Sequence, residues 1–262
     1  MQYLFDAWDE VSRCLKAADH ILFLSDFDGT LTHIVDRPEL AVISREIARL
    51  LRKLVKNRRY TVGIISGRAL TDLKERVDVE GIIYSGNHGL EIEGLGTSFI
   101  EPLAEEIRPF FQLLSQILTI TLKGIKGVLV ENKGLTLTVH YRSVDDAEQH
   151  LVKDKFNEVI DQLHITGKIR ITRGKKVYEI RPPINWDKGK AISLLIAKFK
   201  AVKKGGTLLP LYLGDDLTDE DAFKAIVAYD GISIYVGEEY IKSGARYFLR
   251  SPDEVEELLK IL

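Results

Sequence analysis

Residues 21–32, with the sequence ILFLSDFDGTLT, decide the fold that we expect for this chain. Four apolar residues at 21–24 lead into two carboxylates, Asp26 and Asp28. An unbroken apolar run is typical of a strand buried on both faces, as in a parallel sheet covered by helices. Such sheets bind ligands at the carboxyl ends of their strands, and residues two apart in an extended segment point the same way. The stretch therefore predicts a doubly wound α/β sheet with both carboxylates facing one site.

The residues around these carboxylates leave two interpretations open. Two carboxylates this close repel each other unless one holds a proton or a cation lies between them. Gly29 allows a sharp turn after them, and Thr30 adds a hydroxyl and an N–H that can bind an anion. A strand followed by an ordinary Asx turn has a similar sequence. The interpretation as a site therefore depends on partners elsewhere in the chain.

Size and composition exclude several classes of protein. The 262 residues, 45% of them hydrophobic, suit one large domain or a core with a smaller inserted domain. A formal net charge of −2 gives no reason to expect a nucleic-acid partner or an anionic membrane. The only cysteine, Cys14, excludes a disulfide framework and a cysteine zinc site, and we expect it to be buried on a helix. We expect no signal peptide and no transmembrane segment.

Strands and helices alternate in the two ends of the chain but not in its middle. The expected alternating strands lie at residues 21–24, 60–65, 82–85, 208–213, 232–236 and 247–249. This pattern predicts a mostly parallel, Rossmann-like sheet. Residues 104–182 instead show helix, hairpin, helix and hairpin, which is an α+β pattern. We therefore expect a core domain made from residues 1–103 and 183–262, with an α+β cap domain at 104–182 inserted in it.

Two expected helices carry start signals. Ser44 is placed to cap a helix whose inner face includes Ile47 and Leu50. Ser251, Pro252 and Glu254 form the pattern of a capping box at the start of the last helix. The other expected helices lie at residues 3–18, 104–118, 144–163, 188–202 and 220–228, and one more follows Arg68 and ends near Val77.

Four groups of polar residues follow elements that meet at one edge of the expected sheet. They are Asp26 and Asp28 after the first strand, Ser66 after the second, Lys188 at a helix start, and Asp215, Asp216 and Asp219 after the strand at 208–213. A carboxylate that attacks a phosphate monoester meets a dianion, so it needs a hard divalent cation, Mg²⁺ for preference, and an ammonium to offset charge. A hydroxyl can hold a phosphate oxygen. The set predicts a site for phosphoryl transfer.

These groups resemble the four motifs of the haloacid dehalogenase superfamily, in order, as DFDGT, IISGR, the lysine of WDKGKA, and GDDLTDED. The resemblance implies that Asp26 attacks phosphorus and forms an aspartyl-phosphate, and that Asp28 protonates the leaving oxygen and then activates water. It implies that Asp26, Asp215 and the backbone carbonyl of Asp28 bind Mg²⁺, and that Ser66 and Lys188 hold the phosphate. Asp216 and Asp219 stay open as outer or alternative ligands.

Further segments resemble the trehalose-6-phosphate phosphatases of that superfamily, namely GNHGLEI at 86–92, ENKGLTLTVHYR at 131–142 and YEIRP at 178–182. The resemblance implies a phosphoric monoester hydrolase that releases trehalose and phosphate. The residues that it implies for sugar binding are Asn87, His88, Glu131, Lys133, Arg142, Glu179 and Arg181. Thr136 stands where the family often has serine, which keeps a hydroxyl. Polar residues that alternate along a strand are also typical of the wet face of any half-buried sheet.

Alternative functions stay open on the sequence alone. The same chemistry serves another sugar phosphate, such as sucrose phosphate or mannosyl-phosphoglycerate. A catalytically idle sugar-phosphate binding protein is a second alternative, although a binder has no need of the nucleophile Asp26. A nucleotide-binding protein is a third, but the chain has no GxxxxGK[ST] loop and no GxGxxG after the first strand. We expect a cytoplasmic monomer without a nucleic-acid or membrane partner, and the protein partner considered is a trehalose-6-phosphate synthase.

Overall fold

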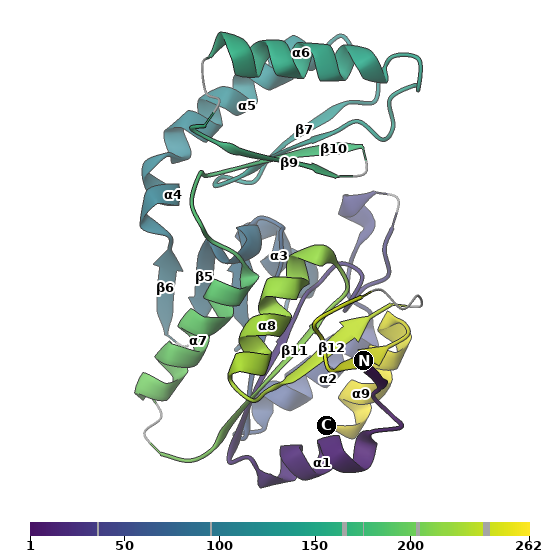
Figure 1. Ribbon diagram of the computed structural model, residues 1–262, viewed down its shortest axis with the longest axis vertical. Helices are drawn as coiled ribbons and strands as arrows, with labels where there is room; N and C mark the ends of the chain where they lie inside the picture. The colour runs from purple at the N-terminus through teal and green to yellow at the C-terminus, as the bar shows by residue number, and fades with distance from the viewer. Residues whose placement is uncertain (36, 95, 164–166, 175, 203–204, 238–241) are drawn as a thin grey trace. The chain divides into compact units, whose positions relative to one another are not determined.

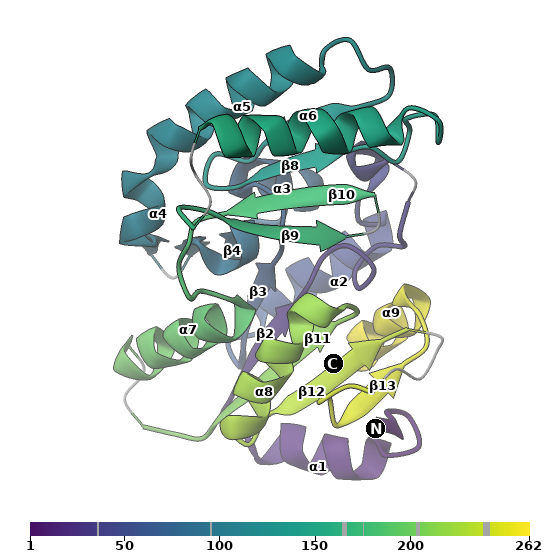
Figure 2. The same ribbon diagram turned by 45° about the horizontal axis from the view of Figure 1, so that its top comes forward.

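The structure is a computed structural model that describes residues 1–35, 37–94, 96–163, 167–174, 176–202, 205–237 and 242–262. The chain folds into two compact units, whose elements are labelled in Figures 1 and 2. The core unit is made from Met1–Phe99 and Trp186–Leu262, and the inserted unit from Ile100–Asn185. In the described ranges, no helix is both long enough and apolar enough to cross a membrane.

In the described residues, the core unit is built on a nine-stranded sheet. Its strands are β1 (Gln2–Tyr3), β2 (His20–Ser25), β3 (Tyr60–Ile65), β4 (Ile83–Gly86), β5 (Glu91–Gly94), β6 (Thr97–Ile100), β11 (Leu208–Gly214), β12 (Ile232–Val236) and β13 (Tyr247–Leu249). Their order is β1-β13-β12-β11-β2-β3-β4-β5-β6. In this order, every neighbouring pair between β1 at one edge and β4 is parallel, whereas β5 pairs with β4 antiparallel. The expected mostly parallel sheet is confirmed.

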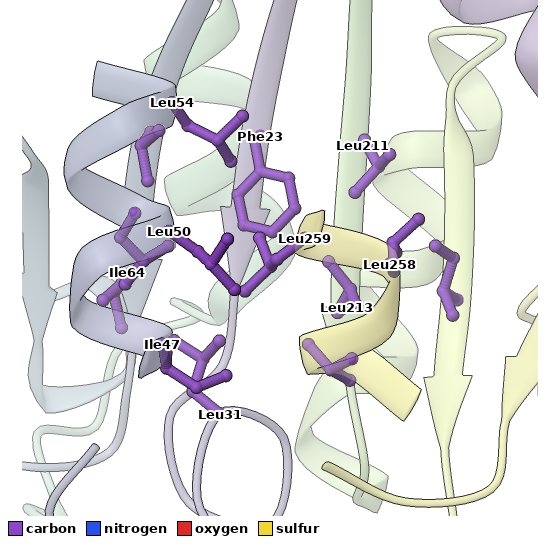
Figure 3. Packing of buried hydrophobic residues seen from close by; sticks show 14 of the residues in the cluster. Phe23, Leu31, Ile47, Leu50, Leu54, Ile64, Leu211, Leu213, Leu258 and Leu259 are labelled. Carbon is purple, nitrogen blue, oxygen red and sulfur yellow. The ribbon is translucent and has the colours of Figure 1, made fainter. Parts of the chain in front are cut away.

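Helices cover both faces of this sheet. They are α1 (Trp8–Ala17), α2 (Arg45–Lys56), α3 (Leu70–Val77), α7 (Lys188–Val202), α8 (Glu220–Ala228) and α9 (Pro252–Ile261). In β2, Ile21 and Phe23 pack in a cluster with α1, α2, α3 and α9, and Figure 3 shows Phe23 among leucines of that cluster. Leu22 and Leu24 pack with α7 and α8 on the other face. Because both faces of β2 are buried, its sequence is an unbroken apolar run.

The two expected helix caps have different outcomes. Ser44 caps α2, because its Oγ accepts the backbone N–H of Ile47 at 3.0 Å. The capping box expected at Ser251 is wrong, since among the described residues its side chain makes no cap hydrogen bond. Glu254 instead accepts the backbone N–H of Arg250 at 2.7 Å and the hydroxyl of Tyr3 at 2.9 Å. Its carboxylate joins the start of α9 to the N-terminal strand.

The N-terminal segment differs from the expected single helix. The helix α1 begins at Trp8, because residues 2–3 pair with β13 as the short strand β1. The prediction of a buried Cys14 is wrong, since Cys14 is exposed. The buried stripe of α1 is formed by Val11 and Leu15, and Cys14 lies beside it on the solvent side. Two further strands of four residues each, β5 and β6, are not among the expected elements.

The inserted unit is an α+β unit, as expected. Its elements are α4 (Pro102–Glu106), α5 (Arg108–Leu122), β7 (Leu129–Asn132), β8 (Leu137–His140), α6 (Gln149–Gln162), β9 (Arg170–Gly174) and β10 (Val177–Arg181). The strands form an antiparallel sheet in the order β7-β8-β10-β9. Apolar residues of α5 and α6 pack with Val139 and Tyr178 on one face of it. The opposite face carries the polar residues that alternate with these positions.

Two helices of the inserted unit have bounds other than those expected. The helix expected at 104–118 is two helices, α4 and α5, with Ile107 between them and a proline in the first turn of the second. The helix expected to begin at 144 begins at Gln149. Before it, the Asp145 side chain accepts the N–H of Ala147 at 2.9 Å. Such an Asx contact favours a turn over a helix.

Candidate active site

Three neighbouring strands bring distant residues to one edge of the core sheet. The strands β11, β2 and β3 lie side by side and run parallel (Figure 2). Asp215 directly follows β11, Asp26 follows β2, and Ser66 follows β3. Because parallel neighbours end at the same edge, these residues share the carboxyl edge, where open α/β sheets bind ligands.

Three carboxylates gather at this edge. One oxygen each of Asp26, Asp215 and Asp219 can be chosen so that all three lie within 4.8 Å of one another. Asp26 and Asp219 are buried, and Asp215 is half-buried. Hard divalent cations prefer carboxylate oxygens. These three residues could therefore hold a metal ion.

Lys188, the first residue of α7, lies between two of the carboxylates. Its Nζ is 3.1 Å from Oδ1 of Asp26 and donates to Oδ1 of Asp219 at 2.7 Å, and its side chain is 2% exposed. Burial alone would lower the pKa of Lys188, but Asp219 and Asp26 outweigh burial and hold the pKa above its ordinary value. The site therefore contains a charged ammonium beside Asp26.

Asp219 organises the loop that follows β11. One of its oxygens accepts from Lys188 and from the hydroxyl of Tyr212, at 2.7 and 2.5 Å. The other accepts the backbone N–H groups of Asp215 and Asp216, at 2.9 and 3.1 Å. Burial would raise the pKa of Asp219, but Lys188 outweighs burial and lowers the pKa. Asp219 is thus an ionised anchor for both the ammonium and the loop backbone.

Without a bound metal ion, the carboxyl groups of Asp26 and Asp215 are hard to ionise. Burial raises the pKa of Asp26 well above its usual range, although Lys188 acts in the opposite direction. Burial raises the pKa of Asp215 to about 7, and the charges of Asp219 and Asp216 add to this effect. Clustered carboxyl groups with raised pKa values are typical of functional sites.

Gly29 makes room for one of these carboxylates. Its φ is +80°, and a Cβ at this position would lie 2.1 Å from Oδ2 of Asp215. A side chain at residue 29 would therefore strain the backbone and displace the carboxylate. This requirement explains the glycine in DFDGT.

We expect Gly29→Ala to weaken the binding of a divalent cation at least about tenfold, because Asp215 must move away from the new methyl group. Isothermal titration calorimetry measures the affinity. Gly96→Ala is the matched control, since Gly96 has a φ of +71° and no described atom lies within 4 Å of its Cβ position. The control carries only the backbone strain, about 1 kcal/mol. Equal cation affinity in the two variants would contradict a role for the contact with Asp215.

The carboxylate of Asp28 is turned to Arg68. Nε of Arg68 donates to Oδ2 of Asp28 at 2.7 Å, and Nη2 donates to Oδ1 at 2.6 Å. The side chain of Arg68 is 8% exposed and that of Asp28 is 43% exposed. Two parallel bonds of this kind fix the plane and the position of a carboxylate. The arginine of IISGR therefore sets where Asp28 lies.

Ser66, Asn87 and His88 belong to one hydrogen-bonded pair of turns. The Oγ of Ser66 accepts the N–H of Arg68 at 3.2 Å, and its backbone carbonyl accepts the N–H of His88 at 2.9 Å. The N–H of Asn87 donates to the carbonyl of Arg68 at 2.7 Å. Both Asn87 and His88 have positive φ values, 49° and 57°. The turn after β4 is thus joined to the turn after β3.

In the inserted unit, the register places two carboxylates beside one threonine. Glu131 of β7 and Glu179 of β10 both pair with Thr138 of β8. Directly paired residues point to the same face of a sheet. Nε2 of His140 lies 2.9 Å from Glu131, and Arg181 donates to Glu179 at 2.6 Å.

The remaining two candidate residues of this unit lie differently. Lys133 follows β7, and its Nζ is 3.9 Å from Oε2 of Glu131. Arg142 is exposed in the turn after β8. The structure thus gathers Glu131, Lys133, Glu179 and Arg181 around one sheet and leaves Arg142 beyond the end of its strand.

Comparison with known proteins adds the family. The profile described as trehalose-phosphatase matches residues 24–253. The chain belongs to the trehalose-phosphatase family. Probable trehalose-phosphate phosphatase 3 of Oryza sativa subsp. japonica is 35% identical over 273 residues, which cover 98% of this chain and 73% of that protein. Probable trehalose-phosphate phosphatase D of Arabidopsis thaliana is 33% identical over 265 residues, which cover 97% and 70%.

Solved structures of trehalose-phosphatases share the fold. The C-terminal domain of the C. albicans trehalose-6-phosphate phosphatase matches with a TM-score of 0.79 at 26% identity, over 97% of this chain and 96% of that chain. The resemblance that the motifs indicated is therefore confirmed, as is the enzyme class, a phosphoric monoester hydrolase.

The site of this trehalose-phosphatase includes contacts that sequence reasoning missed. Arg68 lies in the motif IISGR and Tyr212 in the strand β11, but neither is among the residues that the sequence predicts for the site. Tyr212 is fully buried, and its hydroxyl donates to Asp219. A tyrosine within a buried aliphatic strand was the available signal, because a buried hydroxyl needs a hydrogen-bond partner.

Proposed function

We propose that this chain hydrolyses trehalose-6-phosphate to trehalose and phosphate through an aspartyl-phosphate on Asp26. The observation that carries the proposal is the placement of Asp26 in a chain of the trehalose-phosphatase family. Asp26 is buried at the carboxyl edge of the sheet, 3.1 Å from the Lys188 ammonium and beside two further carboxylates. A nucleophilic carboxylate that must meet a phosphate dianion needs positive charge nearby, and Lys188 supplies one such charge.

The acidic cluster fits Mg²⁺ as the cofactor. Its donors are carboxylate oxygens, which small hard cations prefer. Asp26 and Asp215 would hold the ion, together with the backbone carbonyl of Asp28. Asp219 is the weaker candidate ligand, because its two oxygens already accept four hydrogen bonds. When bound, the ion would supply positive charge that offsets the negative charges of Asp26 and the phosphate.

The reaction then proceeds in two steps on residues of the core unit. In the first, a carboxylate oxygen of Asp26 bonds to phosphorus while the bond from phosphorus to the sugar oxygen breaks. Asp28 gives its proton to that oxygen, so trehalose leaves as an alcohol. In the second, water attacks phosphorus, Asp28 takes a proton from the water, and the bond to Asp26 breaks. Lys188 and Ser66 hold the phosphate oxygens in both steps.

The residues that we propose for binding the sugar are polar. Trehalose presents hydroxyl groups, so its site needs carboxylates, amides and cations. In the inserted unit, Glu131 and Glu179 lie on one face of the sheet and offer acceptors. Lys133, Arg142 and Arg181 offer cationic donors there. In the core unit, Asn87 and His88 contribute from the turn that is bonded to Ser66.

A substrate panel tests the proposed function. Phosphate release is measured with trehalose-6-phosphate, glucose-6-phosphate, sucrose-6-phosphate and 4-nitrophenyl phosphate, each with Mg²⁺ and with EDTA. We expect Mg²⁺-dependent turnover that is selective for trehalose-6-phosphate. Faster turnover of another sugar phosphate would keep the mechanism and replace the substrate. A folded chain that binds Mg²⁺ and turns over none of them would favour a binding protein.

The affinity for Mg²⁺ is expected to depend on pH between 6 and 8. The pKa of Asp215 is about 7, raised by burial, so this ligand is mostly protonated at pH 6 and mostly ionised at pH 8. A metal ion must displace that proton. The affinity should therefore fall by up to about tenfold per pH unit below 7. Calorimetric titration at pH 6, 7 and 8 measures it, and a dissociation constant that does not change across this range would contradict the role of Asp215.

The setting of the enzyme is also proposed. A single cysteine and a net charge of −2 support a cytoplasmic enzyme that acts on a free sugar phosphate. We propose that it acts as a monomer, with a trehalose-6-phosphate synthase as the candidate protein partner. Analytical ultracentrifugation tests the monomer, and the mass of two chains would contradict it.

A further inference from the structure

A row of alternating charges leads away from Asp28. Arg68, which binds both oxygens of Asp28, also donates through Nη1 to Oδ2 of Asp72 at 2.9 Å. Nε of Arg76 lies 2.8 and 2.7 Å from the two oxygens of Asp72. We call Asp28, Arg68, Asp72 and Arg76 the charge row. Its last two members lie one turn apart on α3.

The far end of the charge row is fixed to another segment. Nη1 of Arg76 donates to the backbone carbonyls of Glu39 and Ala41, both at 2.9 Å. The two guanidinium groups are the most buried side chains of the row, since Arg68 is 8% exposed and Arg76 14%, against 43% for Asp28. Asp72, at 31% exposed, is therefore held between two well-buried guanidinium groups.

The bonds of Arg68 to Asp28 and to Asp72 differ in what they fix. The bonds to Asp28 tie the guanidinium to a half-exposed side chain, whereas the bond to Asp72 ties it to α3. The pKa of Asp72 is lowered by its two arginines, which outweigh its partial burial, so this anchor is ionised. An ionised anchor bound through several short hydrogen bonds is strong and directional.

We propose that Asp72 is a positioning residue for the protonation of the leaving sugar oxygen, acting through Arg68 on Asp28. This inference rests on the proposed function, in which Asp28 gives that proton. A proton donor must lie within hydrogen-bond reach of its acceptor. Asp72 itself touches neither the substrate nor the reacting atoms, and it sets the position from which Asp28 acts.

The test compares two leaving groups in the first step alone. Trehalose leaves as an alcohol and needs the proton from Asp28, whereas 4-nitrophenolate leaves readily as an anion. Single-turnover release of the leaving group excludes the second step, in which Asp28 acts on water. We expect Asp72→Asn to slow the release of trehalose about tenfold, since misplacing a general acid loses part of its 10²–10⁴-fold contribution. The release of 4-nitrophenolate should change by less than about twofold.

Two matched variants separate positioning from general damage. Asp72→Glu keeps the carboxylate and is expected to restore most of the rate with trehalose-6-phosphate. Glu93→Gln makes the same kind of change in the exposed pair of Glu93 with Lys74, which also involves α3, and should alter neither rate. If Asp72→Asn is unfolded at the assay temperature, Arg76→Gln removes the outer anchor and should give the same selective slowing, to a smaller extent.

The outcomes distinguish this inference from the proposed function. Equal slowing of both leaving groups, or no slowing of either, would overturn the role of Asp72. Failure of the unaltered enzyme to release trehalose would overturn the proposed function whatever Asp72 does. Selective slowing with trehalose-6-phosphate, rescued by Asp72→Glu, supports the positioning role.

Discussion

Replacement of Asp26 by asparagine is expected to abolish the turnover of trehalose-6-phosphate, with a loss of about 10⁴-fold or more in kcat. An amide nitrogen or oxygen cannot take the place of the attacking carboxylate oxygen, so no aspartyl-phosphate forms. The change is nearly isosteric, and Lys188 keeps its 2.7 Å hydrogen bond to Asp219. The loss should therefore arise in the chemistry and not in folding.

Two measurements check this expectation. Steady-state phosphate release gives the size of the loss, and acid quenching of the enzyme with substrate traps phosphorylated chain. The unaltered enzyme should yield chain phosphorylated at Asp26, and Asp26→Asn should yield none. Asp146→Asn, which changes an aspartate with an 86% exposed side chain in the inserted unit, is the matched control and should keep full activity. An Asp26→Asn enzyme with more than about 1% of the original activity would rule out the covalent route.

The core fold was predictable because its strands are buried on both faces. The residues Ile21 to Leu24 alternate between two separate clusters, and no exposed face interrupts the apolar run. The expected bounds of β3, α7 and α8 agree with the structure, because each segment keeps one consistent pattern of apolar residues. The strand β5 contains a single apolar side chain, Ile92, and so has no apolar run.

Local signals failed where a distant residue competes for the same group. Glu254 has the spacing of a capping box with Ser251, but its carboxylate is bound by Arg250 and by Tyr3, which lies 251 residues away in the chain. The contact with Tyr3 cannot be seen in a window of neighbouring residues. The burial expected for Cys14 rests on residue type alone, whereas its position on α1 faces solvent.

In the candidate site too, some features follow from the pattern of strands and others depend on contacts between distant residues. Sheet order brings Asp26, Ser66 and Asp215 to one edge, and this follows from the strands alone. The pairing of Asp28 with Arg68 depends on side-chain direction across 40 residues of sequence. The sequence predicts that Asp26 and Asp28 point the same way because it assumes an extended backbone there. The strand β2 ends at Ser25, so this assumption does not hold for the two aspartates. Motifs therefore named the residues, whereas the structure supplies their partners.

Replacement of Lys188 by methionine is expected to affect both stability and turnover. The change leaves the carboxylates of Asp26 and Asp219 buried without the ammonium between them. Removing one partner from a buried ion pair costs about 3–5 kcal/mol in the free energy of unfolding. The kcat should fall about 10²–10³-fold, because the phosphate loses a cation that offsets its charge.

The stability that Lys188→Met loses is expected to depend on pH. Without Lys188, the pKa of Asp26 rises further above its usual range, and the pKa of Asp219 loses the main cause that lowers it. The folded variant then binds more protons across the acidic range than the unaltered folded protein does, so the stability that the variant loses grows as the pH rises. The deficit of Lys188→Met should accordingly be small near pH 4 and largest near pH 8. Urea unfolding at the two pH values measures the difference.

Two variants separate the structural and chemical roles of Lys188. Lys224→Met removes an exposed lysine that pairs with Asp221, and it should cost less than about 1 kcal/mol at either pH. Adding Asp219→Asn to Lys188→Met removes one of the two buried carboxylates that have lost the ammonium, so part of the lost stability should return. The lost activity should not return, because the phosphate still lacks its ammonium. A double variant that regains turnover would show that Lys188 serves only to neutralise Asp219.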